Sequence, residues 1–228
     1  MNVYYDHDKS ELIFRNAKIE WADAKNAPFL KVEQMLTIVA EGENTIEMTS
    51  AKEFIHALNH VIIKGEEPSV NKLVAYGITY AQYADKEPYS GIFAYLGQTG
   101  SLAISNVTVG ADYFESAIVG STGDSHSVTF EKASVGMFVS KEATKEITEM
   151  NFIECAITKP AGAEFSPELR GIALNGQLVF GETVTIRPVS EGIENTLVNG
   201  GNQKFFRDGQ LFILRGDKTY TVQGQEVK

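Results

Sequence analysis

Short stretches in which apolar and polar residues alternate recur along most of the chain. Each stretch alternates for a few residues, breaks at a polar pair and then resumes, as in Ser101–Gly110 and Ser127–Gly136. Alternation with a period of two is typical of a half-buried β-strand. The polar pairs reverse the phase of the alternation, so we expect a corner between two short strands at Arg15–Asn16, Ser105–Asn106 and Glu131–Lys132.

These stretches recur at nearly constant spacing. Their first strong apolar residues are separated by 24, 26, 40, 26, 24 and 26 residues, beginning at Leu12, Leu36, Ile62, Leu102, Val128, Phe152 and Leu178. A repeat of about 25 residues that carries two short strands is typical of a solenoid. We predict an all-β protein: a right-handed parallel β-helix of roughly seven or eight coils over residues 1–195, then a short β-hairpin or meander over residues 196–228.

An all-β sandwich, which also has short strands at regular intervals, is the alternative fold. The even spacing, the likeness among the stretches and the scarcity of two-residue hairpin signals before residue 195 favour the β-helix. One segment departs from both patterns. Phe54, Ile55, Leu58 and Val61 have helical spacing, which predicts either a short helix at residues 51–60 or a turn that leads into the next strand.

The net charge and the apolar content of the chain exclude some classes of partner. The net charge of −10 repels phosphate backbones and anionic lipids, so we expect no nucleic-acid partner. No apolar run is long enough for a membrane helix, and the first ten residues lack the features of a signal peptide.

The single cysteine, Cys155, lies in an apolar stretch, which predicts a small buried side chain rather than a nucleophile.

Candidate catalytic residues are few. Asp112 with either Asp124 or Glu115 could supply the paired carboxylates of a glycosidase, although such acids are also common in turns. Ser125, His126 and Ser127 are adjacent in sequence, but neighbours on a strand point to opposite faces.

A metal site has equally little support in the sequence. His56 and His60 have the spacing of a helical zinc pair but lack the glutamate that follows the first histidine of the protease motif. We therefore assign no catalytic residue, metal or cofactor.

The best candidate binding surface lies in the longest step of the repeat, where a coil is enlarged or an extra one added. This segment holds five of the nine tyrosines: Tyr76, Tyr80, Tyr83, Tyr89 and Tyr95. Exposed tyrosines offer flat faces to sugar rings and lose little side-chain entropy on binding. The alternative is that these tyrosines pack a loop onto the rod.

The order of the stretches resembles a family of repetitive β-helix carbohydrate-binding domains from secreted proteins of gut anaerobes. The resemblance covers roughly residues 3–187 and is carried by Tyr4–Glu20, Gly91–Val109 and, best of all, Leu36–Ile46. It implies an exported protein, at the cell surface, outside the cell or in the periplasm, whose partner is a polysaccharide or a host or cell-surface glycan. The tail, Lys204–Lys228, is similar to the terminal tail of exported proteins of the same bacteria.

Relatives in that family bind calcium, but the resemblance does not carry a calcium site here. Calcium favours clustered aspartates, and residues 24–203 contain only Asp85, Asp112 and Asp124. The first hypothesis is thus a non-catalytic glycan-binding or adhesin-like module. A polysaccharide lyase or glycoside hydrolase on the same scaffold, and a structural spacer without a ligand, are the alternatives.

Overall fold

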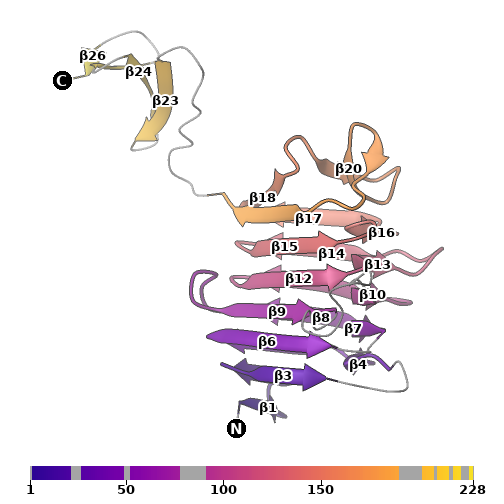
Figure 1. Ribbon diagram of the computed structural model, residues 1–228. Coiled ribbons are helices and arrows are strands. Elements are labelled where there is room, and N and C mark those ends of the chain that lie inside the picture. The colour runs from indigo at the N-terminus through magenta and orange to yellow at the C-terminus, as the bar shows by residue number, and fades with distance from the viewer. Residues whose placement is uncertain are drawn as a thin grey trace, which may run out of the picture. The chain divides into compact units, whose positions relative to one another are not determined.

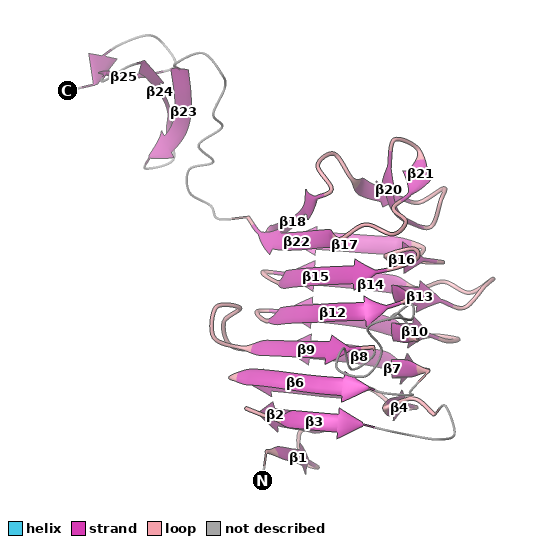
Figure 2. Ribbon diagram, in the orientation of Figure 1, coloured by secondary structure: helices cyan, strands magenta, loops and turns pink. Residues whose placement is uncertain are grey.

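The computed structural model describes residues 2–21, 27–48, 52–77 and 91–189, together with the C-terminal strands 202–207, 210–215, 218–221 and 226–227. Strands are the regular structure throughout these residues (Figure 2). Nowhere in these ranges does a helix occur that is long and apolar enough to cross a membrane.

Within the described residues, stacked strands of the N-terminal part form three large sheets (Figure 1). Sheet A contains β1 (Val3–Asp6), β2 (Glu11–Arg15), β5 (Leu36–Glu41), β8 (His60–Lys64), β11 (Ser101–Ser105), β14 (Ser127–Glu131) and β17 (Glu149–Ile153). Sheet B contains β3 (Lys18–Trp21), β6 (Glu43–Met48), β9 (Lys72–Tyr76), β12 (Thr108–Phe114), β15 (Ser134–Val139), β18 (Cys155–Lys159) and β22 (Val184–Pro188). Sheet C contains β4 (Leu30–Val32), β7 (Glu53–Ala57), β10 (Ile92–Leu96), β13 (Ser116–Gly120) and β16 (Thr144–Lys145).

Each turn of the chain adds one strand to each sheet, beginning with β2, β3 and β4, and neighbouring turns pair in parallel. This arrangement confirms the predicted parallel β-helix. The described residues form about five turns, fewer than the seven or eight expected. Among the described residues, the step of 40 residues contributes one turn, β8–β9–β10, and residues 160–188 form a cap rather than further coils.

The corners between sheets A and B lie where the polar pairs predicted them. Asn16, Asn106 and Lys132 have φ angles of 47°, 51° and 48°. A single residue in this left-handed conformation turns the chain sharply, and asparagine tolerates it well. The buried Asn44 secures the first corners, since its side chain accepts a hydrogen bond from the Ala17 amide at 2.8 Å and donates to the Lys72 carbonyl at 3.1 Å.

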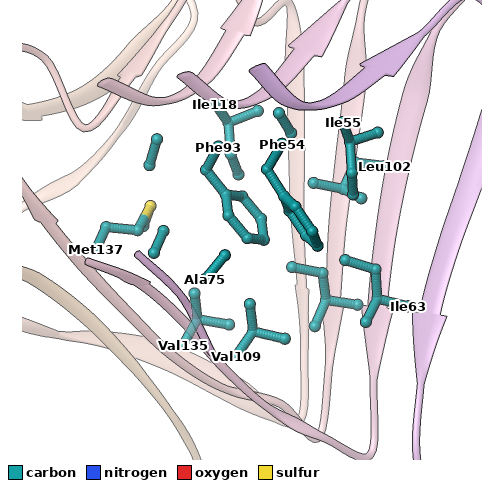
Figure 3. Close-up of a cluster of buried hydrophobic side chains, with 14 of the residues drawn as sticks. Phe54, Ile55, Ile63, Ala75, Phe93, Leu102, Val109, Ile118, Val135 and Met137 are labelled. Carbon is teal, nitrogen blue, oxygen red and sulfur yellow. The ribbon is translucent and has the colours of Figure 1, made fainter. Parts of the chain in front are cut away.

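The core runs along the inside of the stack. In sheet A the inward side chains form a column in register: Leu12, Ile38, Ile63, Ile104, Phe130 and Phe152. A second column is aromatic, and its ring centroids are 5.4 Å apart for Phe29–Phe54, 5.2 Å for Phe54–Phe93 and 5.9 Å for Phe93–Phe114. Figure 3 shows Phe54 and Phe93 side by side inside the stack, opposite apolar side chains that include Val109 and Val135.

The segment with helical spacing is not helical. Its described residues form β7 and β8, with a corner at Leu58–Asn59. Phe54 and Val61 are both buried, but they belong to different sheets around one core. The corner between them interrupts the period of two, which is why the spacing imitates a helix.

The final predicted coil, at Leu178, is wrong in direction and place. Gln177–Leu178 is β21 of a small antiparallel sheet with β19 (Glu164–Ser166) and β20 (Gly171–Leu174). Strand β22 runs antiparallel to β15 and β18. This segment buries Ile172 and Val179 against the core, and so covers an edge that would otherwise accept another strand.

Val189–Lys228 is a separate compact unit. Its described strands are β23 (Asn202–Arg207), β24 (Gln210–Arg215), β25 (Lys218–Thr221) and β26 (Glu226–Val227), each antiparallel to the next. This order confirms the predicted C-terminal meander. The predicted boundary between residues 195 and 196 lies outside the described residues.

Candidate functional site

The outer face of sheet B carries a row of residues that runs across its strands. Glu47, Tyr76, Asp112 and Phe138 are successive register partners on β6, β9, β12 and β15, the strands that face the viewer in Figure 1. Ala111, next to Asp112, is buried in the core. Because side chains alternate along a strand, Asp112 and its partners point outward.

A bulge adds a third aromatic ring to this row. The pairing of β12 with β15 shifts between Asp112 and Phe114, and Tyr113, the residue between them, has a φ of 63°. Its ring centroid lies 6.2 Å from that of Tyr76, with planes 27° apart, and 5.3 Å from that of Phe138, at 84°. We call Tyr76, Tyr113 and Phe138 the aromatic row.

The conformation of Tyr113 is costly. A bulky residue at positive φ costs roughly 1–2 kcal/mol relative to the usual regions. Backbone strain and β-bulges are both concentrated at functional sites, where a bulge redirects a side chain. Phe138 retains 37% of its exposure, so part of the aromatic row is accessible to a ligand.

Charge and burial also distinguish this surface. Burial raises the pKa of the Asp112 carboxyl, an effect that nearby Lys72 opposes. Burial, followed by the charges of Asp112, Tyr113 and Glu47, raises the pKa of the Tyr76 hydroxyl. The folded protein therefore binds the Asp112 proton more tightly than the unfolded chain does. This contribution to stability is present at low pH and lost as the pH rises through the raised pKa, so the ionised carboxylate lowers stability near neutrality.

The five predicted tyrosines do not share one surface in the described residues. Tyr76 belongs to the aromatic row, whereas Tyr95 lies on the outer face of sheet C, in register with His56 and with its ring centroid 5.1 Å from the imidazole. Tyr80, Tyr83 and Tyr89 lie outside the described residues. Tyr113 and Phe138 were not among the predicted residues, although two adjacent aromatic residues at Tyr113–Phe114 interrupt the alternation where the bulge forms.

The candidate carboxylates belong to different parts of the coil. Asp112 is on the outer face of sheet B, whereas Asp124 is in the turn between β13 and β14, where it accepts a hydrogen bond from the Ser121 hydroxyl at 2.6 Å. Glu115 forms an ion pair with Lys141 at 3.2 Å. None of these acids therefore has an arrangement that identifies a glycosidase pair.

His126 has a structural environment. It is 1% exposed, its Nδ1 donates to the Gly100 carbonyl at 2.9 Å, and its Nε2 accepts from the Ser121 amide at 3.0 Å. Both ring nitrogens thus hydrogen-bond to the backbone of neighbouring segments. Ser125, by contrast, is exposed.

Replacing His126 with alanine is expected to destabilise the protein by about 1–3 kcal/mol, because the buried Gly100 carbonyl and the partly buried Ser121 amide lose their partner. The change should appear as a lower midpoint in urea unfolding. Ser125→Ala is the matched control and should leave the midpoint nearly unchanged. Equal effects of the two substitutions would contradict this role for His126.

The remaining candidates for metal binding or nucleophilic chemistry are also separated or buried. His56 is on sheet C, with its Nδ1 2.8 Å from Glu53, and His60 is on sheet A, 2.5 Å from the Ser101 hydroxyl. Cys155 is buried, as predicted, and burial raises the pKa of its thiol. Across the ranges that the structure describes, no group of three or more histidine, cysteine or acidic residues could hold a metal ion.

No protein-family model, curated protein or solved structure matches this chain. The outer face of sheet B is therefore the basis for assigning a function.

Proposed function

We propose that this protein is a non-catalytic, exported or surface-associated module that binds a glycan through the aromatic row. Its partner is a polysaccharide or a host or cell-surface glycan. One observation carries the proposal: three aromatic rings from three successive turns are grouped on one outer face, and one of them is held there by a strained bulge.

Aromatic side chains and sugars have complementary surfaces. The C–H groups of a pyranose ring pack against the face of an aromatic ring, and tyrosine adds a hydroxyl that can donate or accept hydrogen bonds. Asp112, beside the rings, contributes acceptor oxygens for sugar hydroxyls, and hydrogen bonds to a charged acceptor are the stronger kind.

The two alternatives have less support from the described residues. A glycoside hydrolase places two carboxylates ~5–9.5 Å apart across the scissile bond, but Asp124 bonds to Ser121 in a turn and Glu115 is paired with Lys141. A spacer without a ligand predicts scattered aromatic residues, whereas Tyr76, Tyr113 and Phe138 are grouped.

Substitution of the aromatic row tests the proposal. Tyr76→Ala and Phe138→Ala should each weaken glycan binding about tenfold or more, because one lost ring contact at the centre of a site is worth ~1.4 kcal/mol or more. Binding is measured by affinity electrophoresis of the full chain through gels that contain soluble polysaccharides. Tyr95→Ala, on sheet C, is the matched control and should bind like the unaltered protein.

Three other results would contradict this proposal. Loss of binding in Tyr95→Ala but not in the aromatic-row variants would move the site to sheet C. Retardation by none of the polysaccharides would favour the spacer. Shortened oligosaccharides in the gel eluate would show an enzyme instead.

A further inference from the structure

The geometry of sheet B defines the ligand further. The aromatic row crosses strands whose backbones are ~4.8 Å apart, and its neighbouring ring centroids are 6.2 Å and 5.3 Å apart. One pyranose unit of an extended, 1,4-linked chain has about the same length as these spacings. A linear chain parallel to the stack can therefore present successive sugar units to β9, β12 and β15, whereas a chain parallel to the strands crosses the row only once.

The surface beside the row leaves room for such a chain at Gly136, whereas the Val74 side chain lies close to Gly110. Gly110 and Gly136 are register partners. Gly110 lies two residues before Asp112 and Gly136 two residues before Phe138, so both glycines are on the outer face of sheet B. A Cβ atom at Gly136 would meet no atom within 4 Å, and one at Gly110 would first meet Val74 at 3.0 Å. Neither glycine has a positive φ, so the backbone conformation accepts side chains that these positions lack.

The charge of the row favours an uncharged ligand. Glu20 and Glu47 continue the row of Tyr76, Asp112 and Phe138 toward the N-terminal end of the stack. Carboxylates in line with the rings repel uronate or sulfate groups.

The described cations on this outer face include Lys18 on β3, Lys72 on β9 and Arg187 on β22. Arg187 donates to the Ser134 hydroxyl, and Lys72 interacts with Asp112. The Asp112 carboxylate partly neutralises the Lys72 ammonium, whereas the neutral Ser134 hydroxyl holds Arg187 in place without removing its charge.

The Asp112 carboxylate can accept hydrogen bonds from the hydroxyl groups of a sugar. Asp112 lies between Tyr76 and Phe138 in the register of sheet B. Within the described part of the chain, no donor hydrogen-bonds to its carboxylate. A half-buried carboxylate without donors lowers stability. Neighbouring hydroxyls of a sugar would supply the missing donors.

Building on the proposed function, we infer that the ligand is a linear, uncharged glycan. It lies along the stack across β9, β12 and β15, with its sugar rings against the aromatic row and over Gly136, and Asp112 accepts hydrogen bonds from its hydroxyls.

Gly136→Val tests this placement. Valine suits a strand and has space here, so the variant should fold normally. Its side chain would stand in the path of the glycan and should lower affinity at least tenfold. Ala103→Val, which adds comparable bulk to the outer face of sheet A, is the matched control and should retain binding. Asp112→Asn keeps the shape of the side chain, removes its charge and should lower affinity several-fold.

The probes are matched pairs of soluble polysaccharides: hydroxyethyl cellulose with carboxymethyl cellulose, and methyl-esterified with de-esterified polygalacturonate. The neutral member of a pair should bind, with little dependence on salt concentration. Binding of only the anionic members, or full binding by Gly136→Val, would overturn this inference and leave the proposed function standing. If the unaltered chain binds no member of either pair and no neutral mannan, xylan or glucan, both proposals fail.

Discussion

Replacing Phe54 with alanine should destabilise the solenoid by about 3–5 kcal/mol, the usual cost of removing a buried aromatic side chain. Phe54 is fully buried, and its ring packs between those of Phe29 and Phe93 at 5.4 and 5.2 Å. The strand that carries it, β7, is hydrogen-bonded to β4 on one side and β10 on the other. The flanking turns therefore cannot move independently into the cavity, so little of the lost packing can be recovered.

The measurement is the midpoint of urea unfolding at a fixed protein concentration, with circular dichroism as the signal. Phe180→Ala is the matched control, because this phenylalanine is 61% exposed, and substitutions of exposed side chains usually change stability by less than ~0.5 kcal/mol. A small effect at Phe54, or an equal effect at Phe180, would show that the aromatic column is not the continuous core described above.

Replacing Gly120 with alanine should destabilise the protein by about 3 kcal/mol, although the substitution adds only one carbon atom. The new Cβ would lie 2.2 Å from the carbonyl oxygen of Glu146 and 2.4 Å from Cδ2 of His126. The carbonyl belongs to the backbone of the next turn, and His126 is held by two backbone hydrogen bonds. Neither neighbour can rotate away, so the turns must separate locally.

Gly136→Ala is the matched control for this prediction. Its Cβ would meet no atom within 4 Å, and alanine is more favourable than glycine inside a strand by roughly 0.5–1 kcal/mol. Thermal unfolding should therefore show a lower transition temperature for Gly120→Ala and an equal or higher one for Gly136→Ala. The same sign for both variants would mean that close approach between turns does not determine the requirement for glycine.

Much of the architecture is local and could be read from the sequence. The period of two identifies strands because a strand buries alternate side chains, and the repeat of about 25 residues identifies a solenoid because each turn repeats the same pattern. The corners at Asn16, Asn106 and Lys132 were predictable for the same reason: each reverses the phase of the alternation within a few residues.

The direction and partners of a strand are not local, and this is where the prediction of the last coil failed. Val184–Pro188 has an apolar pattern that suits a strand in either direction, but the structure inserts it antiparallel between β15 and β18. The helical spacing near Phe54 and Val61 misleads for the same reason. These two residues are buried on different strands, and the corner that joins the strands is not visible in the apolar pattern.

Some features of the candidate site could also be predicted from the sequence, and others depend on the tertiary structure. The sequence by itself marked Tyr76 as a candidate binding residue and determined which positions of each strand point outward, because alternation is a property of the single strand. Only the tertiary structure separated Tyr95 onto sheet C and brought Tyr76, Tyr113 and Phe138 together on sheet B. Those three residues come from successive turns, and their distances are decided by the register between turns, which backbone hydrogen bonds across the sheet establish.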